Sequence, residues 1–183
     1  LYNDSDEENH SPIIGYAFDG YPIYGAYGYS NPLDPNSSIS RMQSGHQHRD
    51  ISTRQTLSDG TNLPAYQYGP AVNFQYPIGS FIEDYEYVEG SGDLDEHNGR
   101  FCITPDYPDG IYSYFITIDD YLDPIYPYVI GPTYFGTVLT GNTGPQSGHN
   151  VIPNNATNYD PETNLCPGDL NADGALTIAD LLL

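Results

Sequence analysis

Glycine and proline punctuate this chain so densely that a long helix cannot fit into it. The 183 residues include 19 glycines and 16 prolines, and no window keeps an amphipathic helical pattern for three turns. Only the stretch 39–57 is long and even enough to hold one short helix. Elsewhere the sequence favours short strands joined by long loops.

Tyrosine supplies the clearest strand signal. In several places two tyrosines are two residues apart, a spacing that puts both rings on one face of a strand. These pairs are Tyr27/Tyr29, Tyr66/Tyr68, Tyr85/Tyr87, Tyr112/Tyr114 and Tyr126/Tyr128. The dipeptides Asp19-Gly20, Asp59-Gly60 and Asp109-Gly110 favour turns between such strands. We therefore expect a mostly β fold, an irregular β-sandwich-like domain with long loops, over residues 1–136.

The composition changes after this domain. Gly, Asn, Thr and Pro dominate residues 137–164, which is typical of a linker. Residues 165–183 then form a short appendage.

The appendage carries oxygen-bearing side chains at positions 1, 3, 5, 9 and 12 of a twelve-residue loop. Its expected ligands are Asp169, Asn171, Asp173, Thr177 and Asp180, together with the backbone carbonyl of Ala175. Gly174 occupies the sixth position, where such a loop turns sharply. The spacing predicts a calcium site. The alternative is an Asx-rich turn in front of a helix, with Thr177 as its N-cap.

The charge of the chain limits its partners. Four arginines, no lysine and 25 acidic residues give a net charge of −21. Such a chain repels nucleic acid and anionic lipid, and no apolar run is long enough to span a membrane. Bound cations, calcium first, are expected to relieve the repulsion and to stabilise the fold.

Two cysteines, together with the acidity and the lack of lysine, favour a secreted or cell-surface protein. Cys102 and Cys166 are candidates for one disulfide that ties the appendage to the domain. The alternative is that Cys166 pairs beyond Leu183. Asn36 and Asn155 begin glycosylation sequons.

A second group of potential ligands lies in the segment 92–100, which holds Asp93, Asp95, Glu96, His97, Asn98 and Arg100. Three interpretations remain open: a second metal site, a structural network in which a carboxylate accepts the Arg100 guanidinium, and general acid–base catalysis. His10, His46, His48 and His97 could also meet around copper or zinc, and the spacing of His46 and His48 puts both rings on one side of a strand. No nucleophile elbow, phosphate-binding loop or zinc-protease motif is present.

Several ordered blocks resemble the YHYH domain family of secreted proteins. They are residues 10–25, 84–88, 92–101, 104–115 and 126–128, within a match over about 10–136. The Tyr-His-Tyr-His motif expected upstream of His10 is absent from the sequence, and His97 stands where the family resemblance leads us to expect cysteine. The resemblance implies an extracellular domain. If the family motif binds metal, the matching candidates here are His10, Asp19, Asp95 and Asn98.

The appendage is similar to the first half of a type I dockerin repeat, because its loop ends in Asp180 and follows Cys166-Pro-Gly. We therefore expect a secreted, calcium-binding structural or adhesive protein that self-associates into oligomers or filaments by β-strand addition. One alternative is a copper- or zinc-binding protein or metal-dependent enzyme. A further alternative is a carbohydrate-binding module in which tyrosines hold an extracellular glycan.

Overall fold

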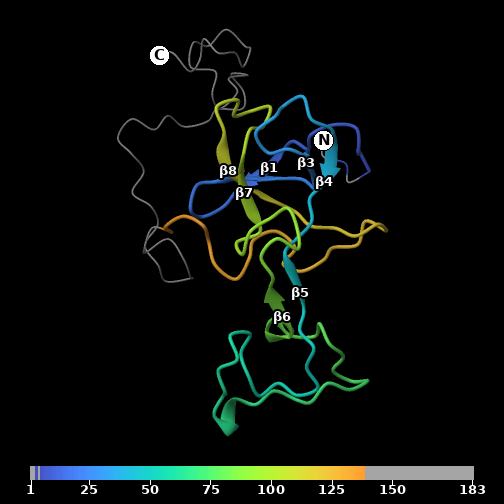
Figure 1. Cartoon of the computed structure of the whole chain (residues 1–183), viewed down its shortest axis with the longest axis vertical. Coiled ribbons are helices and arrows are strands. Elements are labelled where there is room, and N and C mark those ends of the chain that lie inside the picture. The colour runs from blue at the N-terminus through green and yellow to red at the C-terminus, as the bar shows by residue number, and fades with distance from the viewer. Residues whose placement is uncertain (1–2, 4, 139–183) are drawn as a thin grey trace, which may run out of the picture. The chain divides into compact units, whose positions relative to one another are not determined.

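The computed structural model describes residue 3 and residues 5–138, and this part of the chain is mostly β (Figure 1). Its strands are β1 (Ile13–Tyr16), β2 (Pro22–Tyr24), β3 (Tyr27–Tyr29), β4 (Ile39–Arg41), β5 (His46–His48), β6 (Tyr85–Tyr87), β7 (Gly99–Cys102) and β8 (Ile111–Phe115). Two short 3-10 helices, η1 (Ala65–Gln67) and η2 (Ile82–Asp84), are the only helices among these residues. None of the helices in the described part could cross a membrane. The calcium loop, Cys166 and Asn155 lie outside the described residues.

The largest sheet has four strands in the order β1-β2-β8-β7. The outer pairs are antiparallel and the central pair, β2 and β8, is parallel. Each antiparallel pair is joined through an Asp-Gly turn, at Gly20 and at Gly110, where φ is 89° and 87°. These positive φ values favour glycine over any residue with a side chain. The sequence-based expectation of turns at both dipeptides is confirmed.

Strand alternation gives this sheet a core on both faces. On one face Tyr24 stacks on Phe115, with ring centroids 5.7 Å apart. Met42, Leu94 and Cys102 complete that cluster. On the other face Tyr112 and Tyr114 pack with Ala17, Tyr21, Ile23, Ile130 and Tyr134. Among the described residues, the other β structure consists of two two-stranded ribbons and not of a second large sheet.

Two ribbons complete the β structure. β3 pairs with β4, and β5 pairs with β6, both antiparallel. The short helix expected within 39–57 is wrong, because β4 and β5 occupy that stretch. Each of these strands gains ladder hydrogen bonds from a tyrosine-rich partner, and such tertiary pairing overrides a weak local helical preference.

Residues 49–84, which we call the lobe, leave the second ribbon at the end of β5 and return to it at the start of β6 (Figure 1). The lobe buries no apolar side chain. Its buried residues are Arg49, Arg54 and Asp84. In place of an apolar core, the lobe is organised around two guanidinium groups and one carboxylate.

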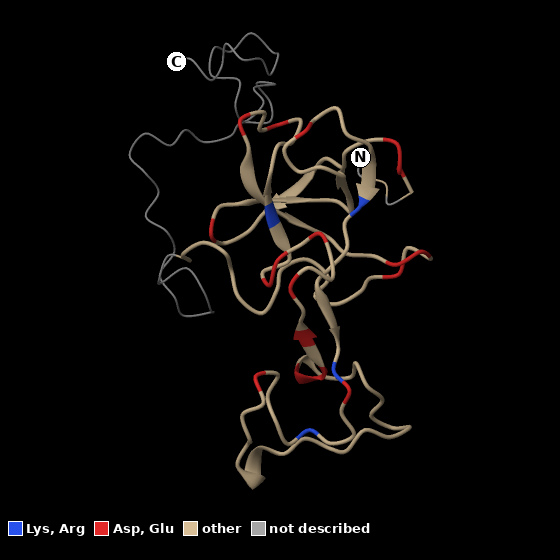
Figure 2. Ribbon diagram, viewed as in Figure 1, with Lys and Arg blue, Asp and Glu red and all other residues tan. Residues whose placement is uncertain are grey.

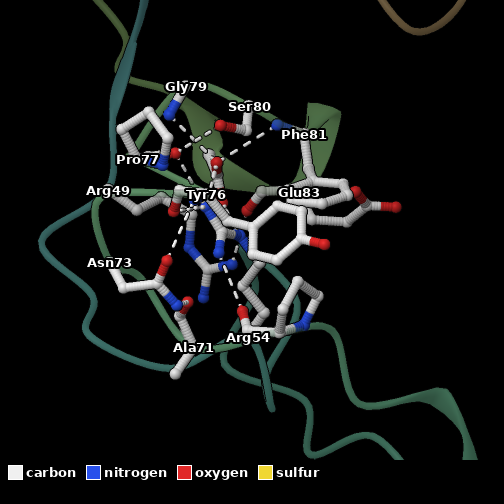
Figure 3. Close-up of polar contacts among 12 residues, drawn as sticks. Arg49, Arg54, Ala71, Asn73, Tyr76, Pro77, Gly79, Ser80, Phe81 and Glu83 are labelled. Carbon is white, nitrogen blue, oxygen red and sulfur yellow. Dashed lines mark hydrogen bonds and ion pairs between the residues drawn. The ribbon is translucent and has the colours of Figure 1, made fainter.

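The buried Arg54–Asp84 pair joins several segments of the lobe, and Figure 3 shows Arg54 among residues of these segments. Arg54 Nη2 donates to Asp84 Oδ2 at 2.7 Å, and Arg54 Nη1 donates to the Pro70 carbonyl at 2.8 Å. The amides of Gly79 and Phe81 also donate to Asp84, at 2.9 and 3.1 Å. Burial opposes the ionisation of Asp84, but the hydrogen bonds from Arg54 and from the two amides outweigh it and lower its pKa.

Arg49 makes a second set of contacts of the same kind. Its guanidinium donates to the carbonyls of Thr56, Leu57 and Glu83 at 2.8–2.9 Å. The arginine thereby ties the two ends of the lobe together. Figure 2 shows that acidic residues otherwise lie mainly along the loops of the described chain.

Candidate functional site

The β5–β6 ribbon presents four aromatic side chains to one side of the molecule. His46 pairs with Tyr87 and His48 pairs with Tyr85 across the ladder. Because side chains two residues apart share a face of a strand, all four rings project to the same face. His48 lies 4.7 Å from Tyr85 and His46 lies 5.6 Å from Tyr87, measured between ring centroids.

A fifth ring reaches this face from a distant part of the chain. Tyr126 stacks on Tyr85 with centroids 4.0 Å apart and ring planes 20° apart. It also meets His46 edge-on at 5.3 Å. Tyr128, at 6.0 Å from Tyr126, has a φ of 72°, in the left-handed region that a side chain adopts rarely. The segment around Tyr126 is therefore held in a defined, non-extended conformation against the ribbon.

Three hollows meet at the stacked Tyr85–Tyr126 pair, which borders all of them. Their volumes are about 330, 550 and 280 Å³. The first is also bordered by Glu83, Glu86 and Glu96, the second by Ile82, Pro127 and Ile130, and the third by His48, Pro124 and Tyr128. We call the three hollows together the aromatic groove.

The ionisation states of the groove are set mainly by burial. Burial lowers the pKa of His46, although the Glu96 carbonyl opposes the shift, so the imidazole is neutral at neutral pH. His46 Nε2 lies 3.1 Å from the Glu96 carbonyl oxygen, an arrangement in which Nε2 carries the hydrogen and Nδ1 is an acceptor. Burial raises the pKa of Tyr85 and of Tyr126, so both phenols keep their protons and can donate.

The residues predicted for the second metal site do not all lie together, because His10 lies apart from Asp19. His10 packs among Tyr24, Tyr29 and Phe115 at centroid distances of 5.0–6.0 Å. Asp19 accepts a hydrogen bond from Tyr114 Oη at 2.6 Å. His10 contacts Tyr24 and Asp19 contacts Tyr114, and these two tyrosines belong to different core clusters. The two side chains therefore lie on different faces of the four-stranded sheet.

The acidic loop 92–100 is organised around its own backbone and a tyrosine. Asp95 accepts from Tyr112 Oη at 2.8 Å and from the His97 amide at 2.9 Å. Asn98 donates from a fully buried Nδ2 to the Phe115 carbonyl at 2.9 Å. Asp93 accepts from the Gln43 amide at 3.0 Å.

Of two further side chains in this loop, Glu96 is exposed and His97 is partly buried. His97 Nδ1 lies 2.9 Å from Thr133 Oγ1, and its Nε2 is 3.9 Å from the exposed carboxylate of Glu96. In residues 5–138, no three His, Cys, Asp or Glu side chains converge in a way that could hold a metal ion. A copper or zinc site that uses the predicted residues stays a prediction.

The proposed carboxylate partner of Arg100 is wrong. Arg100 Nη2 donates to the Tyr29 carbonyl at 2.5 Å, and the guanidinium lies over the Phe115 ring at 5.5 Å. A backbone acceptor and an aromatic face thus contact this arginine, while its buried Nε has no hydrogen-bond partner among the described residues.

The remaining candidates are placed as follows. Cys102 is fully buried in the core beside Tyr24 and Phe115, and burial raises the pKa of its thiol. Its pairing with Cys166 stays a prediction, since Cys166 lies outside the described residues. Asn36 is exposed in a turn, where its amide donates to Asp34 Oδ1 at 2.9 Å.

Sequence reasoning found the members of the aromatic groove but not the groove. Tyr85/Tyr87 and Tyr126/Tyr128 were recognised as two separate pairs, and His46 and His48 as metal candidates. The stacking of Tyr126 on Tyr85 joins residues far apart in the chain, and no local spacing signals such a contact.

Comparison with known proteins identifies one relationship. Residues 1–130 match a protein family described as YHYH protein. Neither a curated protein sequence nor a solved structure matches the chain.

Proposed function

Because this chain belongs to the YHYH protein family and carries an aromatic groove, we propose that it is a secreted, calcium-binding adhesive protein that holds a neutral extracellular glycan in that groove. The single observation that carries the glycan is the meeting of three hollows on the Tyr85–Tyr126 stack. Location outside the cell is supported by the composition and the sequons.

The side chains of the groove match the surface of a sugar. A hexose has apolar C–H faces and hydroxyl edges, and tyrosine and histidine offer apolar ring surface with polar tips. Protonated Tyr85 and Tyr126 supply donors, while His46 Nδ1 and the bordering glutamates supply acceptors. An oligosaccharide could place successive units in successive hollows.

Charge selects among glycans. Glu83, Glu86 and Glu96 border the first hollow in a chain whose net charge is −21. A sulfated or uronic-acid polymer would be repelled over its whole length. We therefore expect neutral or amino sugars to bind and polyanionic glycans to fail.

The test is binding of a panel of neutral and sulfated oligosaccharides to the full chain, measured by calorimetry. Tyr126→Ala should lose about five- to 150-fold in affinity, since removal of one stacking ring costs on the order of 1–3 kcal/mol. The matched control is Tyr121→Ala, whose ring is 86 % exposed and borders none of the three hollows. Equal affinity in both variants would remove the groove from the proposal.

Calcium binding at the dockerin-like loop is part of the same proposal, and it rests on the spacing of Asp169, Asn171, Asp173, Thr177 and Asp180. The temperature of thermal unfolding should rise on addition of calcium. At a calcium concentration of about a hundred times the dissociation constant, binding adds roughly 2.7 kcal/mol to the free energy of unfolding. The double variant Asp169→Ala with Asp180→Ala should lose this gain, so it should be less stable than the unchanged chain in calcium and equally stable in chelator. If the variant is less stable than the unchanged chain by the same amount in chelator, the assignment is contradicted.

Self-association is supported by the position of β1. This strand is at one edge of the four-stranded sheet, and Ile14 and Tyr16 are 44 % and 59 % exposed there. Strand addition by another copy would cover this edge. Analytical sedimentation should show oligomers whose proportion rises with protein concentration. The substitution Ile14→Pro should abolish these oligomers.

A second candidate function is transition-metal binding, favoured by the shared face of His46 and His48 on β5. Elemental analysis of the purified chain decides between the two. Stoichiometric copper or zinc that is lost in a His46→Ala, His48→Ala double variant would support the metal, and calcium alone would support the adhesive protein.

A further inference from the structure

Two surface tyrosines from distant parts of the chain meet through their hydroxyl groups. Tyr16 Oη, at the end of β1, lies 3.3 Å from Tyr107 Oη, in the connection between β7 and β8. The Tyr16 side chain is 59 % exposed, and Tyr107 is partly exposed. Neither ring belongs to the aromatic groove or to either core cluster of the sheet.

Structured backbone holds both residues in place. Tyr16 pairs with Pro22 in the β1–β2 ladder. The Tyr107 amide donates to Thr104 Oγ1 at 3.0 Å, and the Tyr107 carbonyl accepts from the Gly110 amide at 3.1 Å. The meeting of the two hydroxyls is therefore a property of the fold and not of two free side chains.

The composition leaves phenols as the main cross-linking groups of this chain. The sequence has no lysine, so bonds that need a lysine amine cannot form within it, whereas it has 19 tyrosines. Phenols are joined by one-electron oxidation, in which two phenoxyl radicals couple through the ring carbons next to their hydroxyls. The hydroxyl ends of the two rings must then lie together, as they do for Tyr16 and Tyr107.

We propose that Tyr16 and Tyr107 form an oxidative modification site at which an extracellular haem peroxidase, with hydrogen peroxide, makes an intramolecular dityrosine cross-link. Each phenol gives up one electron and its hydroxyl proton, and the two ring carbons form a bond. The hydrogen on each joined carbon then moves to the oxygen of the same ring, which restores the hydroxyl and the aromaticity. One hydrogen peroxide accepts the two electrons and two protons and becomes two water molecules. The extracellular setting rests on the proposed function.

The local environment fits this chemistry. The hydrogen bond with Tyr16, followed by burial, raises the pKa of Tyr107 to about 12, so this phenol is protonated at neutral pH. In the product, the two hydroxyls flank the new bond and stay within hydrogen-bonding distance of each other.

The Tyr85–Tyr126 pair is a useful contrast. Its rings lie face to face, 4.0 Å apart with planes at 20°. The bond in dityrosine lies in the plane of both rings, so a stacked pair must swing apart before the product can form. His46 and His48 pack against these two rings and oppose such a movement. The closeness of the Tyr85 and Tyr126 rings therefore does not favour a cross-link between them, whereas Tyr16 and Tyr107 meet at their hydroxyl ends.

The experiment treats the dilute full chain with a haem peroxidase and hydrogen peroxide, followed by cleavage after arginine and mass spectrometry. The four arginines, at 41, 49, 54 and 100, place Tyr16 in the peptide 1–41, Tyr107 in 101–183, and Tyr85 in 55–100. We expect 1–41 joined to 101–183 with the loss of two hydrogen atoms, and fragmentation should locate the bond at Tyr16 and Tyr107. A product that joins 55–100 to 101–183 as the main species would overturn the proposal.

Variants complete the test. Tyr16→Phe and Tyr107→Phe should each remove the cross-linked peptide and its dityrosine fluorescence, while Tyr121→Phe should leave the yield unchanged. Thermal unfolding of each untreated variant verifies that it is folded. If the yield in Tyr16→Phe and Tyr107→Phe equals that of the unchanged chain, the site is wrong. Glycan binding tests the proposed function separately, because it depends on Tyr126 and not on Tyr16.

Discussion

The four-stranded sheet and the lobe of residues 49–84 stay ordered by opposite means. The sheet buries Tyr24, Tyr114 and Phe115 completely. The lobe buries only arginine and aspartate, and Phe74 within it is wholly exposed. One region is thus held by apolar area removed from water, and the other by directional hydrogen bonds to charged groups.

The difference shows how a chain poor in aliphatic residues can still hold a long loop segment, the lobe, in a defined conformation. A guanidinium has five donors in a fixed plane, and in the lobe these donors meet a carboxylate and several backbone carbonyls. The arginine therefore fixes the path of loops that have few hydrogen bonds of their own. The cost is fragility, since loss of one charged partner leaves the other buried and uncompensated.

The largest effect is expected from Phe115→Ala. This substitution empties the site between Tyr24 and the ring's other neighbours and should cost about 3–5 kcal/mol, with loss of the whole described domain. Denaturant unfolding measures it. Phe74→Ala removes the same atoms from the surface of the lobe and should change the free energy of unfolding by less than about 0.5 kcal/mol.

Asp84→Ala should destabilise the lobe alone, whereas Phe115→Ala should destabilise the whole described domain. Removing one partner of a buried ion pair costs about 3–5 kcal/mol, and here the loss falls on the lobe. Hydrogen exchange should rise across residues 49–84 and stay slow in β7 and β8. Asp50→Ala, which changes an exposed aspartate at the start of the lobe, is the control. Simultaneous loss of protection in the sheet would show that the two regions are one cooperative unit.

Tyr112→Phe tests a polar element within the sheet. It removes the hydrogen bond from Tyr112 Oη to Asp95, and a bond to a charged group contributes about 1.5–3 kcal/mol. The apolar packing of the ring is retained, so the domain should unfold at lower denaturant with an unchanged slope. Tyr121→Phe should leave the midpoint where it is. A loss as large as that of Phe115→Ala would mean that the sheet, too, depends on polar contacts.

The smallest effect is expected from mild acid. The folded-state pKa of Asp84 is lowered, so its contribution is present above the ordinary carboxyl pKa and is lost only as pH falls through the lower folded value. Pepsin should therefore leave the lobe intact near about pH 5 and cut it only once the pH has fallen well below the ordinary aspartate pKa of about 3.9. Asp84→Asn should be cut to a similar extent at both pH values. A wild-type lobe that resists pepsin at the lower pH would contradict the ionic account.

Much of the β structure could be predicted from the sequence, because it depends on local rules. Three of the tyrosine pairs, Tyr27/Tyr29, Tyr85/Tyr87 and Tyr112/Tyr114, lie in strands. Glycines follow Asp19, Asp59 and Asp109 with positive φ, as expected of turns. Each of these features needs only a few neighbouring residues to specify it.

The failures have one physical cause. Tyr66 and Tyr68 have the same spacing, but Tyr66 lies in the helix η1 and Tyr68 directly follows that helix. Tyr126 and Tyr128 lie in a loop. A spacing of two shows that a strand is possible, whereas long-range partners decide whether one forms. The same limit hid the Arg54–Asp84 pair and the Tyr85–Tyr126 stack, whose members are brought together only by the complete fold.

The pairing of His48 with Tyr85 has a practical consequence. The polypeptide leaves and re-enters the ribbon at two residues that stand directly opposite each other, a separation that a two-residue Asn-Gly hairpin can span. The lobe is thus an exchangeable cassette, and foreign loops could be grafted between these positions without altering the register of the scaffold. Ile82 and Glu83 of the lobe border the aromatic groove, so any segment grafted there would replace part of the wall of that groove, which makes this site a place to engineer new recognition.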